Sequence, residues 1–291
     1  MRVLLVGGNG QLGRELQYCK PADMELLALA SAELDLREPE EVTARVSGFQ
    51  PQVVINAAAY TAVDRAESER EAAFAVNGQG AVNLAQAART VGAYCIQVST
   101  DFVFDGVQSH PYLSTDRTNP LGVYGASKLA GEQQALAAYP EGVAVVRTAW
   151  LYSTFGNNFV TTMLRLLAER ESIGVVANQV GTPTWGRGLA EALWQMCRVQ
   201  PKGIWHWTDA GVASWYDFAV AIQEEGLICG LLDREISILP INTVDYPTPA
   251  KRPSYSVLDK AETWAALGMT SPHWRVALRR MLLEYKENRG A

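Results

Sequence analysis

Short runs of apolar residues alternate with helix-like patterns through the first half of the chain. The runs are rich in β-branched residues, and they cover residues 2–6, 24–29, 52–59, 93–100 and 143–152. Continuous apolar strands separated by helices are typical of βαβ units, in which helices cover both faces of a parallel sheet. The pattern therefore predicts an α/β fold built on a doubly wound parallel sheet.

The pattern changes after about residue 152. Helical segments over residues 157–171, 187–198, 215–227 and 274–288 alternate there with short segments rich in proline or tryptophan. The sequence has no internal repeats, and no low-complexity linker separates its two halves. We expect one domain over residues 1–152 and a smaller α/β portion over residues 153–291, packed against each other, with some later segments returning to the first sheet.

Composition and charge narrow the class of protein. Of the 291 residues, 48% are hydrophobic and 19% are charged, which predicts a globular chain with a large core. The net charge of −6 and the absence of a basic run argue against nucleic acid as a partner. No uncharged apolar run approaches the roughly 18 residues of a membrane span, so we expect no membrane partner.

The few residues that bind transition metals or form disulfides show no functional spacing. The four cysteines are widely separated, and the three histidines form no paired-ligand motif. The first residues lead into glycines rather than into a small-residue cleavage site. We therefore expect a mature N-terminus, reduced thiols and a cytoplasmic location.

A glycine-rich stretch, "VGGNGQLGREL", follows the first apolar run and opens a helical pattern. Gly7, Gly10 and Gly13 are spaced three apart, and Gly8 adds a G-x-G-x-x-G pattern. Between a strand and a helix, such glycines let the backbone approach a pyrophosphate bound at the helix N-terminus. The alternative is a tight turn without a ligand. We predict a Rossmann-type dinucleotide-binding domain over residues 1–152.

The end of the second apolar run bears on the choice of cofactor. An acidic residue about 20 positions after the glycines usually binds the adenosine ribose, but Ala30 and Ser31 occupy that place here. Without a carboxylate, the 2′-phosphate of NADP meets no repulsion, and Ser31 could donate a hydrogen bond to it. No arginine stands at that strand end. We therefore expect NADPH, with NADH possible, and expect Asp35 and Leu36 to flank the adenine.

The stretch "VYGASKLAGE" places Tyr124 four residues before Lys128, on one face of a predicted helix. A phenol with a pKa of about 10 is poorly matched to proton transfer at neutral pH. An ammonium roughly 4 Å away contributes about 4 kcal/mol, an upper bound of about three pKa units. Lys128 is therefore expected to lower the pKa of Tyr124 toward neutrality. The alternative is a surface pair.

Ser99 and Thr100 close the fourth apolar run, in "VSTDFVF". The carboxyl ends of parallel strands form the ligand-binding edge of an open α/β sheet. A hydroxyl there could polarise a carbonyl group that accepts hydride. The alternative is that both are ordinary turn residues.

Together with the glycine loop, seven segments resemble, in order, the dTDP-4-dehydrorhamnose reductase family. They are "NAAAYTAVDRAE", "STDFVFDG", "VYGASKLAGE", "RTAWLY", "GNNF", "GTPT" and "TPAKRP". This family is a branch of the extended short-chain dehydrogenase/reductases, and the resemblance covers nearly the whole chain. In related epimerases and dehydratases, the segment after the fourth strand typically ends in Val-Tyr-Gly. This chain has Val103, Phe104, Asp105 and Gly106 there instead, which favours the reductase branch.

The resemblance implies a catalytic triad of Thr100, Tyr124 and Lys128. The implied cofactor contacts, besides the glycines and Tyr124, are Gln11, Leu12, Asp35, Leu36, Ala57, Ala58, Ala59 and Lys128, which should also hold the nicotinamide ribose. The implied substrate contacts are Thr61, Val63, Ser99, Thr100, Asp101, Phe102, Tyr124, Trp150, Asn158 and Arg252. A guanidinium can bind a diphosphate bidentately, although Arg252 could instead be a solvated charge.

Some members of the family are described as needing Mg²⁺ at a glutamate-rich dimer interface. Glu15 and Glu284 lie near where such glutamates would fall, but Mg²⁺ ligands have no recognisable spacing. We favour solvated helix faces for both residues and expect a monomer or a homodimer.

The activity implied is NADPH-dependent reduction of the 4-keto group of dTDP-4-dehydro-6-deoxy-L-mannose (dTDP-4-dehydrorhamnose) to dTDP-L-rhamnose, a step toward polysaccharides. Hydride would go to C4 of this nucleotide sugar, and Tyr124 would supply the proton. Two alternatives stay open: a reductase of another 4-keto nucleotide sugar, and a non-catalytic NADP-binding regulatory subunit of the same fold.

Overall fold

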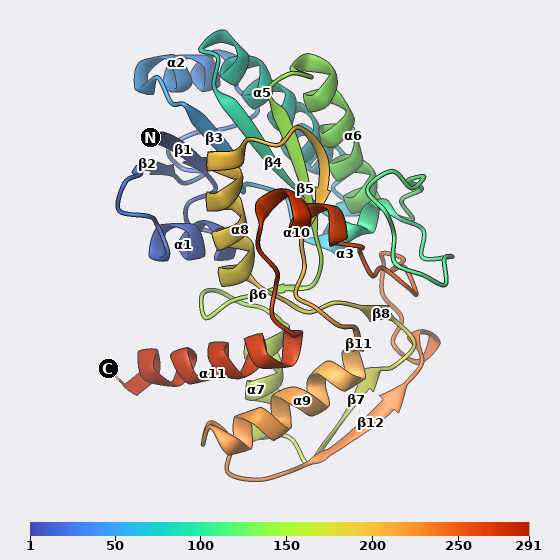
Figure 1. Cartoon of the computed structure of the whole chain (residues 1–291). Helices are drawn as coiled ribbons and strands as arrows, with labels where there is room; N and C mark the ends of the chain where they lie inside the picture. Colours follow the sequence, from blue (N-terminus) through green and yellow to red (C-terminus); the bar gives the residue numbers. More distant parts are fainter. Residues whose placement is uncertain (291) are drawn as a thin grey trace.

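A six-stranded parallel sheet forms the centre of the larger part of the molecule (Figure 1). The computed structural model describes the backbone of residues 1–290 and the side chains of residues 1–288. The strand order is β2(Glu25–Leu29), β1(Arg2–Val6), β3(Val53–Asn56), β4(Tyr94–Thr100), β5(Val143–Thr148) and β10(Gly203–His206). The predicted doubly wound parallel sheet is confirmed, and the first five strands lie within or at the edges of the apolar runs.

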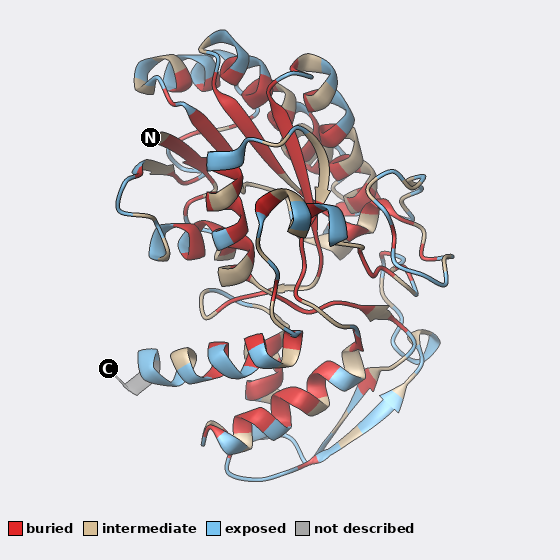
Figure 2. Ribbon diagram, viewed as in Figure 1, coloured by how far each residue is buried: buried red, intermediate tan, exposed pale blue. Residues whose placement is uncertain are grey.

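Helices cover both faces of this sheet, as its buried strands require (Figure 2). One face packs against α2(Pro39–Phe49), α5(Gly80–Thr90) and α6(Val123–Ala138). The other face packs against α1(Gln11–Tyr18), α8(Gly186–Val199) and α10(Ala261–Leu267). Strand β10 and helices α8 and α10 come from the second half of the chain, so the chain returns to the first sheet after residue 152.

The smaller part has a core of its own between three helices and a two-stranded parallel sheet. The helices are α7(Phe159–Glu169), α9(Trp215–Ile228) and α11(Trp274–Gly290), and the strands are β7(Ser172–Val176) and β12(Ser237–Ile241). Two short pairs, β6(Leu151–Tyr152) with β9(Thr184–Trp185) and β8(Val180–Gly181) with β11(Ala213–Ser214), lie where the two parts meet (Figure 1).

Short helices follow the carboxyl ends of β3 and β4. They are α3(Val63–Ala66), α4(Arg70–Phe74) and the π-helical turn η1(Ala75–Gln79) after β3, and η2(Asp101–Val103) after β4. A further short helix, η3(Thr243–Asp245), follows β12 in the smaller part. No helix within residues 1–290 is long and apolar enough to cross a membrane.

The register of the sheet brings distant segments to one edge. Val6 pairs with both Leu29 and Asn56, and Thr100 pairs with Thr148. The residues that follow these strands therefore emerge side by side, at the edge where open α/β sheets bind ligands.

Candidate active site

A cavity of about 730 Å³ runs along this edge between the two parts of the molecule. Twenty of the residues expected at the site line it, from the glycine loop to the C-terminal arginine: Gly7, Gly10, Gln11, Leu12, Ser31, Asp35, Leu36, Ala57, Ala58, Ala59, Thr61, Val63, Ser99, Thr100, Asp101, Phe102, Tyr124, Lys128, Trp150 and Arg252. Asn9, Arg37, Thr148, Leu151 and Trp215 also line it, and the sequence analysis did not identify them.

The glycine loop forms one end of the cavity. Gly7 has a φ of +86°, and a Cβ atom there would lie 2.6 Å from the Ala58 nitrogen. A Cβ atom on Gly13 would overlap the Gly7 carbonyl oxygen, so Gly13 serves the packing of α1 against the loop rather than the lining. Gly10 caps α1 without a side-chain bond to the helix N-terminus. This tight loop and uncapped helix start fit the pyrophosphate of a dinucleotide.

The part of the cavity wall that follows β2 contains a cation that residue spacing did not reveal. The Arg37 guanidinium donates to the Asp35 carboxylate, from Nε to Oδ1 at 2.9 Å and from Nη2 to Oδ2 at 2.5 Å. This hydrogen bond holds the pKa of Asp35 below its usual range. No arginine stands at the end of β2 itself, but Arg37, from the loop that follows β2, lines the cavity wall.

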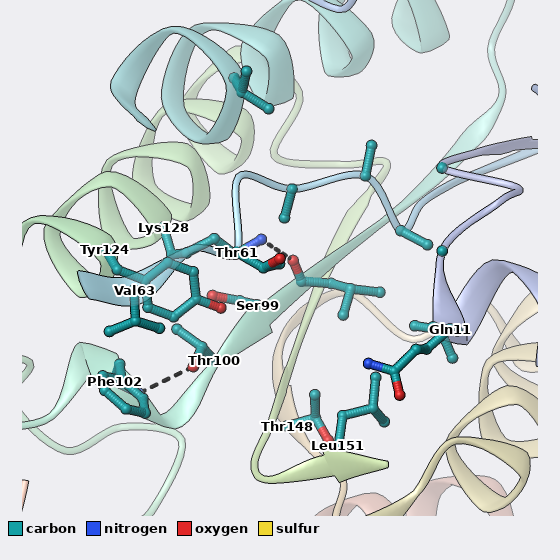
Figure 3. A pocket seen from close by; sticks show the side chains of 18 of the residues that line it. Gln11, Thr61, Val63, Ser99, Thr100, Phe102, Tyr124, Lys128, Thr148 and Leu151 are labelled. Atoms are coloured by element: carbon teal, nitrogen blue, oxygen red, sulfur yellow. Dashed lines mark hydrogen bonds between the residues drawn. The ribbon is translucent and has the colours of Figure 1, made fainter. Parts of the chain in front are cut away.

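Tyr124 and Lys128 lie in the first turns of α6, beside the end of β4 (Figure 3). The buried Lys128 ammonium donates to the Val98 carbonyl oxygen at 2.6 Å. Burial raises the pKa of Tyr124 to about 12 and lowers the pKa of Lys128 to about 8. The prediction that Lys128 brings the phenol toward neutrality is wrong for this structure, because burial dominates and the ammonium bonds a strand carbonyl.

Thr100 is the hydroxyl residue next to the phenol. Its hydroxyl hydrogen-bonds Tyr124, which partly offsets the effect of burial on the phenol's pKa, and it also bonds Asp101 Oδ1 at 3.0 Å. The Phe102 amide donates to Thr100 Oγ1 at 3.2 Å, and the Phe102 ring packs edge-on against Tyr124 (Figure 3). Burial raises the pKa of Asp101 to about 6. Thr100 and Tyr124 are thus held together on one wall.

Ser99 has a different role in this geometry. Its hydroxyl donates to Glu132 Oε1, and Glu132 forms a buried ion pair with Arg147 at 2.7 Å. The single proton of Ser99 is therefore committed to the Glu132 carboxylate, and the Thr100 hydroxyl donates to Asp101 Oδ1, so Thr100 could polarise a carbonyl group only by giving up that bond.

The part of the cavity lined by Trp150, Trp215 and Arg252 is built mainly by the second half of the chain. Arg252 Nη2 donates to Asp64 Oδ2 at 2.9 Å, and the arginine lines the cavity while mostly covered, which disfavours a solvated charge. Trp150, at a φ of +46°, stacks on Trp215 with ring centroids 3.5 Å apart. Gly181 also packs against the indole, where a Cβ atom would be 2.6 Å from Trp150.

Asn158 is placed behind the cavity wall. It caps α7, accepting from the Thr161 amide at 3.1 Å, and its Nδ2 donates to Gln11 Oε1 at 3.0 Å. Within the described residues the structure therefore has Asn158 supporting Gln11 rather than lining the cavity.

Asn77 is a further supporting residue that sequence reasoning did not find. It lies in the π-helical turn η1, donates to Ser127 Oγ at 2.9 Å, and accepts from the Tyr60 amide at 2.8 Å. It thereby ties the loop before Thr61 to α6. The widened turn that aims it has no signal in residue spacing.

The cavity begins at a glycine loop and has a tyrosine and a lysine, one helical turn apart, beside a strand-end threonine. These features place this chain among the extended short-chain dehydrogenase/reductases. The model of the family described as the RmlD substrate binding domain matches residues 1–287. The chain belongs to the dTDP-4-dehydrorhamnose reductase family.

Individual relatives agree with that assignment. The dTDP-4-dehydrorhamnose reductase of Aggregatibacter actinomycetemcomitans is 42% identical over 286 residues, covering 96% of this chain and 97% of that protein. The crystal structure of the Clostridium acetobutylicum dTDP-4-dehydrorhamnose reductase has a TM-score of 0.92 at 38% identity, with full coverage of both chains. That of Bacillus anthracis, in complex with NADP, has a TM-score of 0.92 at 36% identity and covers 97% of this chain and 99% of its own.

Proposed function

We propose that this chain catalyses the NADPH-dependent reduction of dTDP-4-dehydrorhamnose to dTDP-L-rhamnose. The observation that carries the proposal is the convergence of Thr100, Tyr124 and Lys128 on one wall of a cavity that starts at the glycine loop (Figure 3). The relatives named above act on this substrate, as their names state, and one of them binds NADP. Residues 1–152, with β10, α8 and α10, would bind the dinucleotide, and the remaining C-terminal segments would bind the nucleotide sugar.

Residues at different positions along the cavity would bind different groups of the cofactor and the substrate. Gly7, Gly10 and the start of α1 would hold the pyrophosphate, and Arg37, on the cavity wall after β2, would supply a cation to a 2′-phosphate. A bound reduced nicotinamide supplies hydride to the substrate carbonyl carbon. Lys128 would hold the nicotinamide ribose hydroxyls, and the Thr100 hydroxyl would polarise the carbonyl oxygen.

Tyr124 would donate its proton to the oxygen at C4 as the carbonyl is reduced. With a pKa of about 12, the phenol keeps its proton at physiological pH, and it transfers that proton to an alkoxide, which is a stronger base than a phenolate. Arg252 would bind the diphosphate, exchanging part of its bond with Asp64 for charge-assisted bonds to phosphate. The free cysteines suit a reducing cytoplasm, where the enzyme would act as a monomer or a homodimer.

The test compares Tyr124→Phe with wild type in cofactor oxidation by dTDP-4-dehydrorhamnose and by other 4-keto nucleotide sugars. Removing the proton donor should lower kcat by about 10²–10⁴-fold, while NADPH binding, followed by fluorescence, is retained. Tyr139→Phe makes the same change at the other end of α6, and its turnover should match wild type. Near-normal turnover by Tyr124→Phe would refute the assigned role.

The substrate panel separates the alternatives. Faster turnover of another keto sugar would show a reductase of different specificity. NADPH binding without turnover of any keto sugar would show a non-catalytic binding subunit.

A further inference from the structure

Arg187 lies where helices α1, α8 and α11 meet, away from the proposed catalytic wall. Its Nε donates to Glu15 Oε2 at 2.7 Å, and its Nη2 donates to Glu284 Oε1 at 2.8 Å. Glu15 is fully buried, and the arginine and Glu284 are 12% and 16% exposed. The two carboxylates that the family resemblance offered as magnesium ligands are therefore both bonded to one guanidinium, and neither lies on a solvated helix face.

Hydroxyl groups and aromatic rings complete the surroundings of this cation. Ser153 Oγ donates to Glu15 Oε1 at 2.6 Å, so both oxygens of Glu15 are engaged. The guanidinium carbon lies 3.9 Å from the centre of the Tyr18 ring and 5.1 Å from that of the Trp185 ring. In-plane ion pairs and aromatic rings thus hold the guanidinium in one position.

This arrangement does not fit Mg²⁺. The ion needs near-octahedral oxygen ligands, usually carboxylates together with several waters, at about 2.0–2.1 Å. Any such ion bound to Glu15 would have to displace the Arg187 guanidinium from Oε2 or the Ser153 hydroxyl from Oε1. Within residues 1–288 no cluster of three acidic, histidine or cysteine side chains is arranged to hold a metal.

We infer that Arg187 takes the place of a divalent cation, neutralising Glu15 and Glu284 and joining α1, α8 and α11 without Mg²⁺. The bond between Arg187 and Glu15 also positions part of the proposed cofactor site. Glu15 belongs to α1, and this helix begins at Gln11 and Leu12, which line the cavity. An internal cation holds α1 against the C-terminal helix whatever the metal concentration is.

The experiment is thermal unfolding of the full chain in EDTA and in millimolar MgCl₂ at matched ionic strength, with calorimetric titration of MgCl₂ into the apo protein. Wild type should have the same Tm in both buffers and should show no stoichiometric binding. Arg187→Lys, which keeps the charge, should also be insensitive to Mg²⁺.

Arg187→Ala leaves Glu15 buried without its counter-ion, so its Tm in EDTA should fall by roughly 10 °C. Mg²⁺ should restore part of that loss, because the vacated carboxylates are then free to bind it. Arg234→Ala, which removes an exposed arginine paired with Glu171 at 2.8 Å, should change Tm little and show no response to Mg²⁺.

Three results would overturn the inference. They are a Mg²⁺-dependent rise in the Tm of wild type, an unchanged Tm for Arg187→Ala in EDTA, and a destabilised Arg187→Ala that Mg²⁺ does not restore. If Arg187→Ala does not fold, the wild-type and Arg187→Lys measurements still decide the question. None of these measurements uses catalysis, so they stand apart from the proposed reductase activity.

Discussion

Replacing Glu132 by glutamine tests the buried charge network that supports the catalytic wall. Glu132 and Arg147 are 1% and 2% exposed, and the arginine fork reaches the carboxylate at 2.7 Å from Nη2 and 3.1 Å from Nε. Glutamine keeps the volume of the side chain but leaves the Arg147 charge buried without a counter-ion. Removing one partner of such a pair costs about 3–5 kcal/mol, a large share of the roughly 5–15 kcal/mol by which domains are stable.

The same substitution acts on the proposed active site. Glu132 lies one turn after Lys128, and its charge opposes the lowering of the lysine's pKa by burial. Without that charge, the pKa of Lys128 should fall further below about 8. The alkaline limb of kcat/KM should therefore move to lower pH, an effect that loss of stability alone does not produce.

Urea and thermal unfolding measure the first effect, and the pH dependence of kcat/KM measures the second. The Tm should fall by about 6–20 °C. Glu169→Gln is the matched control: its ion pair with Arg165 is exposed, so the free energy of unfolding should change by less than about 1 kcal/mol. The double variant Glu132→Leu/Arg147→Met should recover most of the loss, because no unpaired charge remains. A free energy of unfolding for Glu132→Gln within about 1 kcal/mol of wild type would refute the reasoning.

Two further predictions concern binding. Because the pKa of Lys128 is about 8, its ammonium is charged below that pH; NADPH affinity, followed by fluorescence titration, should be constant at lower pH and weaken as pH rises through about 8. A pH profile of Lys128→Met with the same limb would assign the titration to another group. Arg252→Ala should raise KM for the nucleotide sugar by about 30–150-fold, the equivalent of about 2–3 kcal/mol for charge-assisted bonds, with little change in the dissociation constant of NADPH. An unchanged KM in steady-state kinetics would leave Arg252 only its structural bond with Asp64.

The sequence by itself determined the features that depend on neighbours along the chain. Apolar runs predicted the first five strands, since a strand buried on both faces must be continuously apolar. The glycine loop and the Tyr124–Lys128 pair could be predicted because a strand-to-helix turn and an i,i+4 spacing are local properties. The strand-end position of Thr100 followed from the same apolar pattern.

Only the tertiary structure decided which distant charges meet. Glu15 and Arg187 are 172 positions apart, and Asp64 and Arg252 are 188 apart. Periodicity tells which side of an element is buried, but it does not tell which element covers that side. The pair of Glu15 and Arg187 forms because α8 returns to the first sheet, together with β10 and α10. The sequence predicted only that some later segments would return to this sheet, not which ones.

The pKa values depended on the tertiary structure in the same way. Spacing brought Tyr124 and Lys128 to one helix face, but burial and the direction of the ammonium set the sign of each shift. Whether Ser99 could donate to a substrate likewise depended on Glu132, which reaches it from the opposite side of the strand–helix interface. Residue types and local order come from the sequence, whereas desolvation and long-range pairing exist only once the chain has packed.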